Sequence, residues 1–202
     1  MFTRKGYLQS WKEVRPYFIM SIMLFFAGLL VGGSPGAPAE WLAQQLKGLA
    51  QLSNIAHKSD SPELVMFFII FLNNFLKAVL AMVLGAAVGL FPVYMLVANG
   101  MVIGFLLGEI ADRGENVWLI VLKGLLPHGI LELSAIFLAC AFGVRFGVTL
   151  LQGIAGSVFG KDRAWHPFVR TAIGSVPALI LVFTLLLAAA VVESTVTYWL
   201  MS

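Results

Sequence analysis

The chain has 202 residues, of which 60% are hydrophobic and only 11% are charged. A soluble domain carries about 25% charged residues, so this chain has too few polar side chains to cover a water-facing surface. Its 13 basic residues stand in short clusters beside apolar runs, which is typical of membrane topology rather than nucleic-acid binding. The single cysteine, Cys140, excludes an intrachain disulfide. The composition predicts an integral membrane protein.

Five apolar runs are long enough to cross a bilayer, because a hydrocarbon core of about 30 Å needs roughly 20 helical residues. They lie at residues 16–32, 64–91, 93–110, 118–142 and 172–200. The runs predict an all-α integral membrane protein, a bundle of about five transmembrane helices that forms one membrane domain over residues 1–202. Between the last two runs we expect an inner loop with a weakly amphipathic segment.

The basic residues are distributed unequally between the two sides of this bundle. One side would hold eight of them: Arg4, Lys5, Lys12, Arg15, Arg145, Lys161, Arg163 and Arg170. The other would hold three, namely Lys47, Lys58 and Arg113. Because Lys and Arg are enriched in cytoplasmic segments, we expect a cytoplasmic N-terminus and an external C-terminus.

The N-terminal region also has features of a secretory signal. A basic stretch and an apolar run precede Ala37-Pro38-Ala39, which has the form of a cleavage site. The fifteen-residue basic segment is long for that role. Cleavage would leave the orientation of the remaining spans unchanged.

Residues 40–56 predict an amphipathic helix on the outer surface. Leu42, Leu46, Leu49 and Ala56 recur at steps of three, four and seven residues, so they share one face of a helix. This helix would lie against lipid headgroups, bind a partner, or cover the bundle.

Several glycines recur four residues apart. The sets are Gly28/Gly32, Gly85/Gly89, Gly100/Gly104/Gly108, Gly143/Gly147 and Gly156/Gly160. Small residues at this spacing let membrane helices approach closely. We therefore expect the third span, with Asn99 beside its glycines, to be the central helix. The same glycines would also allow two copies of the chain to form a homodimer.

A small set of polar residues lies inside the predicted spans. Its members are Asn73, Asn74, Lys77, Asn99, Lys123, His128, Glu132 and Glu193. With about 1.5 Å of rise per residue, Lys77 and Glu132 both lie roughly 21 Å below the outer face. Since polar residues in membranes pair with one another, we expect a Lys77–Glu132 ion pair near Asn99 and a second pair between Lys123 and Glu193.

His128 and Glu132 are four residues apart, so a continuous helix places them on one face. An imidazole and a carboxylate suit a metal ion such as zinc; a third ligand would come from Glu193, Asn73, Asn74 or a second subunit. The alternative is a structural polar network without a metal. Pro127 predicts a kink or local unwinding next to His128.

Four stretches of the chain carry recognisable motifs: LLPHGILELSA at 125–135, FLNNFLKAVL at 71–80, VANGMVIG at 97–104 and AAAVVES at 188–194. Together they resemble the stage II sporulation protein M family. The family often has proline where this chain has Ser134. The residues that match the family pattern are Asn73, Asn74, Asn99, Gly100, Pro127, His128, Gly129, Glu132 and Glu193.

The resemblance implies a multi-pass protein of the cell membrane without established catalytic activity. In spore formers the family acts at the septum during engulfment and is thought to anchor the sporulation proteins D and P, which degrade peptidoglycan. The first functional hypothesis is therefore a membrane scaffold whose partners are the lipid bilayer and such proteins. The alternatives are an intramembrane zinc-dependent hydrolase centred on His128 and Glu132, and a small transporter or channel lined by Asn73, Lys77, Asn99 and Glu132.

Overall fold

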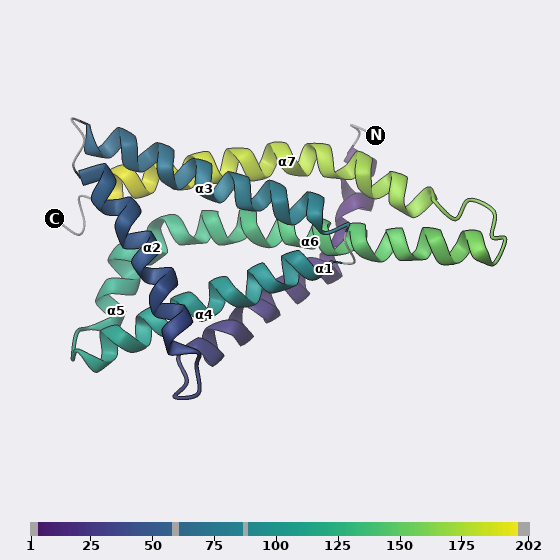
Figure 1. The fold of residues 1–202 in the computed structure, drawn as a ribbon. Coiled ribbons are helices and arrows are strands. Elements are labelled where there is room, and N and C mark those ends of the chain that lie inside the picture. The colour runs from purple at the N-terminus through teal and green to yellow at the C-terminus, as the bar shows by residue number, and fades with distance from the viewer. Residues whose placement is uncertain (1–3, 58–60, 87–88, 198–202) are drawn as a thin grey trace.

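The computed structural model describes residues 4–57, 61–86 and 89–197, which form helices and turns without a strand (Figure 1). In chain order the helices are α1 (Arg4–Gly32), α2 (Ala39–His57), α3 (Pro62–Leu84), α4 (Leu90–Asp112), α5 (Val117–Ile120), the π-helix η1 (Val121–Leu125), α6 (Leu126–Val158), α7 (His166–Val192) and the π-helix η2 (Glu193–Thr197). Within these described residues, five helical stretches are long and apolar enough to cross a membrane, which confirms the predicted span count. They are Leu8–Gly32, Leu64–Leu84, Leu90–Asp112, Val117–Val158 and His166–Thr195. The last residues of the run predicted at 172–200 lie outside the described part of the chain.

The second span is shorter than the predicted 64–91. Helix α3 ends at Leu84, and α4 begins directly after Gly89, whose φ of 73° lies in the left-handed region that favours glycine. Pro92 stands in the first turn of α4. Backbone N–H groups in a first turn have no partner within the helix, so the N–H that proline lacks costs no hydrogen bond there. Gly89 therefore caps the start of α4, and the proline belongs to the helix that follows it.

The fourth span is longer than predicted, because α6 continues through most of the segment expected to be an inner loop. No proline interrupts residues 143–158, and the described turn between α6 and α7 covers only 159–165. Close contacts fix this turn: Gly153 packs against the Trp165 ring and Gly156 against Ala164. The resulting α6–α7 hairpin projects beyond the neighbouring helices (Figure 1).

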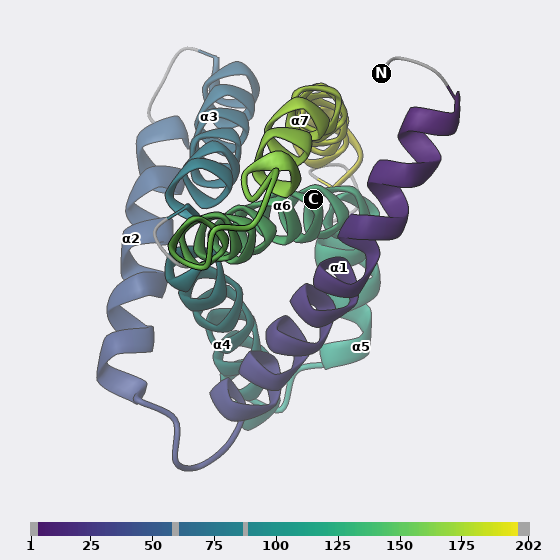
Figure 2. The ribbon, with the colours of Figure 1, turned by 90° about the vertical axis from the view of Figure 1, so that its right-hand side faces the viewer.

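Helix α6 is the centre of the bundle, and the prediction that the third span is central is wrong. In the end-on view of Figure 2, α1, α3, α4 and α7 surround α6. Of its apolar stretch 72% is buried, against 28% or less in each of the other four spans. Small residues such as Ala135, Ala139 and Gly143 let neighbours approach α6 from several sides, whereas α4 uses its glycines only against α1.

The glycine ridge predicted on the third span does pack closely, against α1. A methyl group added at Gly100 or Gly104 would overlap the backbone of α1, and one added at Gly28 or Gly32 would overlap the backbone of α4. Gly108, the last member of the ridge, has no atom within 4 Å of such a methyl group. The ridge therefore joins two helices of the same chain, so it gives no support to a dimer.

Helix α2 lies across the ends of α3 and α4, transverse to the spans (Figures 1 and 2). Leu42 is fully buried beneath it and Leu46 is half-buried, while Gln44, Gln45 and Lys47 are exposed. This distribution confirms an amphipathic helix at one end of the bundle. The side chains of Leu49 and Ala56, which complete the predicted apolar face, lie outside the described residues.

Candidate functional site

Three elements bring polar side chains together at one place in the bundle, which we call the polar centre. Helix α3 supplies Asn73, Asn74 and Lys77, α6 supplies His128 and Glu132, and η2 supplies Glu193. On each long helix the four-residue spacing places the side chains on one face. Because α3, α6 and η2 pack against one another, those faces meet.

The innermost part of the polar centre is formed by His128, Glu132 and Glu193. One ligand atom from each lies within 4.8 Å of the other two, and His128 Nε2 is 3.9 Å from Glu193 Oε2. The His128 side chain is only 9% exposed and that of Glu193 28%, so both are largely shielded from solvent and lipid. An imidazole and two carboxylates so arranged can hold a divalent cation or share protons within the protein.

The α3 residues surround this group. Asn73 Nδ2 donates a hydrogen bond of 3.3 Å to Asn74 Oδ1, and the Asn74 side chain in turn hydrogen-bonds to the Glu132 carboxyl group. Lys77 interacts electrostatically with Glu132, although no nitrogen–oxygen distance between them is short enough to form an ion pair. The structure thus brings the predicted pair together without direct contact.

A π-helical turn stands where a kink or unwinding next to Pro127 was expected. The Leu126 N–H donates to the Val121 carbonyl, five residues back, and the helix remains continuous. In a regular α-helix the proline ring would clash with the Lys123 carbonyl, so the wider turn accommodates Pro127. A second π-helical turn, η2, begins at Glu193 and packs against the first. Such turns are frequent at functional sites.

Two further polar residues do not join the centre. The predicted Lys123–Glu193 ion pair is wrong: Lys123 is exposed in η1, and Glu193 faces His128 instead. The π-helical turn changes the helical phase between Lys123 and His128, so depth alone could not predict their neighbours. Asn99 is half-buried on α4, and no hydrogen bond or ion pair joins it to the polar centre within the described ranges.

A second ionic cluster was missed by the sequence reasoning. Glu13 of α1 accepts from both Arg145 of α6 and Arg170 of α7, and Arg145 is 4% exposed. Its Nη1 atom has no hydrogen-bond partner within the described residues. From the sequence, both arginines are expected only as charges that flank the spans. The available signal was Glu13, the single acidic residue in the basic N-terminal segment.

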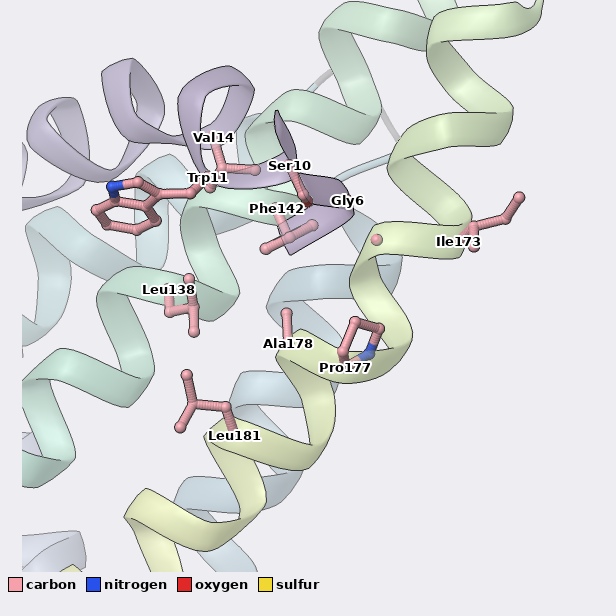
Figure 3. A pocket seen from close by; sticks show the side chains of 11 residues that line it. Gly6, Ser10, Trp11, Val14, Leu138, Phe142, Ile173, Pro177, Ala178 and Leu181 are labelled. Atoms are coloured by element: carbon pink, nitrogen blue, oxygen red, sulfur yellow. The ribbon is translucent and has the colours of Figure 1, made fainter. Parts of the chain in front are cut away.

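An apolar cavity of about 150 Å³ opens between α1, α6 and α7 (Figure 3). Its lining consists of Gly6, Ser10, Trp11, Val14, Leu138, Phe142, Ile173, Gly174, Pro177, Ala178 and Leu181. No residue of the polar centre belongs to this lining. The cavity is therefore separate from the polar centre.

Comparison with known proteins places this architecture in a family. Two uncharacterised proteins of Methanocaldococcus jannaschii are similar to the chain: one is 26% identical over 73% of this chain and 63% of its own length, the other 29% identical over 65% of this chain and 70% of its own length. The chain thus spans less than two thirds of the first relative. No solved structure matches it. The family model described as "Stage II sporulation protein M" matches residues 17–198, which include all six residues of the polar centre, and the chain therefore belongs to the stage II sporulation protein M family.

Proposed function

We propose that the protein is a non-enzymatic scaffold of the cell membrane that anchors peptidoglycan-degrading proteins on the outer side. The observation that carries the proposal is the position of α2, which lies across one end of a five-span bundle with polar residues exposed. A scaffold needs such a surface outside the bilayer. Family membership supports the class of partner, which in a spore former would be the sporulation proteins D and P at the engulfing septum.

The spans themselves support a role in anchoring. Large apolar side chains such as Met23, Leu30, Phe68 and Leu72 are more than half exposed on the outer faces of α1 and α3. Contiguous apolar surface of this kind suits lipid rather than water. The bilayer would thus hold the bundle, and α2 would remain at its surface for a partner.

Photo-crosslinking in cells tests the scaffold. A crosslinking amino acid replaces Gln45 on the exposed face of α2, and in the matched control it replaces Leu72 on the lipid-facing side of α3. We expect a covalent adduct with a peptidoglycan-degrading protein from the α2 position only. If both positions give the same adducts, or if neither captures a cell-wall enzyme while the protein is present in the membrane, the proposed scaffold is wrong.

The proposal requires α2 to lie outside the cytoplasm, as the distribution of basic residues predicts. Lys47 is exposed on α2, and Lys161 is exposed in the turn between α6 and α7. In intact cells, a membrane-impermeant maleimide should label the Lys47→Cys variant and leave the Lys161→Cys variant unlabelled until the membrane is opened. The reverse pattern would place α2 in the cytoplasm and contradict the proposal.

An intramembrane metal-dependent hydrolase is the second candidate, favoured by the proximity of His128, Glu132 and Glu193. It would need a bound ion to activate water and should lose substrate cleavage in the Glu132→Gln variant. Retention of adduct formation at α2 in that variant would support the scaffold over the hydrolase. The cavity of Figure 3 contains no residue of the polar centre, so this cavity gives no support to the transporter hypothesis.

A further inference from the structure

We infer that His128, Glu132 and Glu193 form a binding site for a divalent first-row transition-metal ion, with zinc as the first choice. The site would join the start of α6 to the end of α7, because two ligands come from α6 and the third from η2. This inference is independent of the proposed scaffold. A metal can hold these helices together whether or not α2 recruits a partner.

The distances are close to those of a metal site. Ligand atoms that lie about 2.0–2.2 Å from a tetrahedral ion are about 3.3–3.6 Å apart. His128 Nε2 and Glu193 Oε2, at 3.9 Å, are close to this separation. The three ligand atoms lie within 4.8 Å of one another, so the longest separation would shorten by up to about 1.5 Å on metal binding, which rotation about the side-chain torsions of the two glutamates can provide.

The chemistry of the ligands favours zinc over the hard alkaline-earth ions. Zinc accepts histidine nitrogen together with glutamate oxygen, and three protein ligands leave one position of a tetrahedral ion for water. Calcium and magnesium prefer an all-oxygen shell of six or more ligands. A buried imidazole at the centre of the group therefore points to a transition metal.

The surrounding residues would orient the ligands. Asn74 hydrogen-bonds to Glu132 and itself accepts a hydrogen bond from Asn73. Second-layer hydrogen bonds of this kind fix ligand carboxylates and strengthen metal binding. Lys77 is near Glu132 without forming a direct ion pair, so it does not occupy the carboxylate oxygens.

The backbone is also irregular beside these three side chains. One π-helical turn, η1, accommodates Pro127 and ends three residues before His128, and the other, η2, begins at Glu193. Turns of this kind are rare and are frequently found at functional sites. In a network without a metal, other groups must balance the charges of the two carboxylates in this partly buried place. A single divalent ion would neutralise both.

The competing arrangement needs no ion. Lys77 would balance Glu132, and a protonated His128 would balance Glu193, with which it already lies at 3.9 Å. The two arrangements differ in one measurable quantity, the metal content of the purified protein. They also differ in whether zinc changes its stability.

The full chain is purified without a polyhistidine tag in lipid nanodiscs, incubated with zinc chloride, passed into metal-free buffer, and analysed by mass spectrometry for metal. We expect about one zinc ion per chain. His128→Ala and Glu193→Gln should each reduce the content at least tenfold. His166→Ala, at an exposed histidine that begins α7, and Glu109→Gln, at a glutamate of α4 whose side chain is 45% exposed, should leave it unchanged.

Gel filtration and circular dichroism check that each variant is folded. Glu193→Gln is suited to this test because glutamine has nearly the same volume as glutamate. Zinc should raise the Tm of the wild type and not that of Glu193→Gln. If both ligand variants fail to fold, X-ray absorption of the zinc-loaded His57→Ala/His166→Ala double variant decides, because His128 is then its only histidine. A shell with one imidazole supports the site. Wild-type protein that retains less than a tenth of an ion per chain, or folded Glu193→Gln that retains as much zinc as the wild type, overturns it.

Discussion

Replacing Gly104 by alanine should loosen the contact between α1 and α4. A methyl group at this position would overlap the Leu29 carbonyl oxygen and lie 2.9 Å from the Gly33 nitrogen. Both are backbone atoms, so no side-chain rotation relieves the overlap and the helices must separate. Gly108 is one turn further along the same helix and has nothing within 4 Å of the added methyl group, which makes Gly108→Ala the matched control.

The magnitude follows from two opposing terms. Overpacking costs about 1–3 kcal/mol, whereas alanine is favoured over glycine in a helix by about 1 kcal/mol. Gly104→Ala should therefore lower the free energy of unfolding by about 0–2 kcal/mol, and Gly108→Ala should raise it by up to about 1 kcal/mol. At about 2–4 °C per kcal/mol for a chain of this length, the Tm values of the two variants should differ by roughly 2–12 °C.

Thermal unfolding of both variants in the same detergent, followed by tryptophan fluorescence, measures this difference. The two proteins contain the same substitution and differ only in its position, so helix propensity cancels in the comparison. Gly28→Ala, whose methyl group would meet the Val97 backbone from the opposite side of the contact, should behave like Gly104→Ala. If Gly104→Ala melts at the same temperature as Gly108→Ala or above it, the close approach of α1 and α4 is refuted.

Two further changes test the interior of the bundle. Glu13→Gln removes the carboxylate that Arg145 and Arg170 share, so we expect it to lower the free energy of unfolding by about 3 kcal/mol in equilibrium denaturation; the exposed Arg15→Gln should change it by less than about 0.5 kcal/mol, and equal losses would show that the cluster contributes nothing. Cys140 is fully buried on α6, so a small maleimide should label it only after denaturation, and labelling of the folded protein would contradict the central position of α6.

The number and type of helices could be predicted from sequence because each span is a long apolar run between polar segments. The ends were less predictable. The second span ends at Leu84, and α4 begins only after Gly89, which takes a left-handed conformation; hydropathy does not report backbone conformation. The fourth continues to Val158 because the turn that follows is fixed by contacts between distant residues, such as Gly153 with Trp165.

The candidate site was predictable to the extent that depth and helical spacing determine it. Six of the polar residues that were singled out in the spans meet at the polar centre, whereas Lys123 and Asn99 do not. Lys123 departs because a π-helical turn changes the direction of side chains within η1, and local sequence did not predict that turn. The cluster around Glu13 was missed for another reason. Basic residues beside the spans were interpreted only as a signal of topology. Helix α6 continues past this flank, however, so Arg145 lies in the interior of the bundle.

The two ionic centres together explain why the central helix carries charge at all. Glu132 and Arg145 are thirteen residues apart, which is roughly 20 Å along α6, and every residue between them except Ser134 is apolar or glycine. Apolar packing alone fixes the depth of such a helix less strongly than charge pairing does, since lipid and protein side chains are equally apolar. At one end Glu132 and His128 face α3 and η2, and at the other Arg145 faces Glu13 of α1. Sliding or rotation of α6 would break both sets of contacts, so the charges fix its depth and its orientation among the surrounding helices.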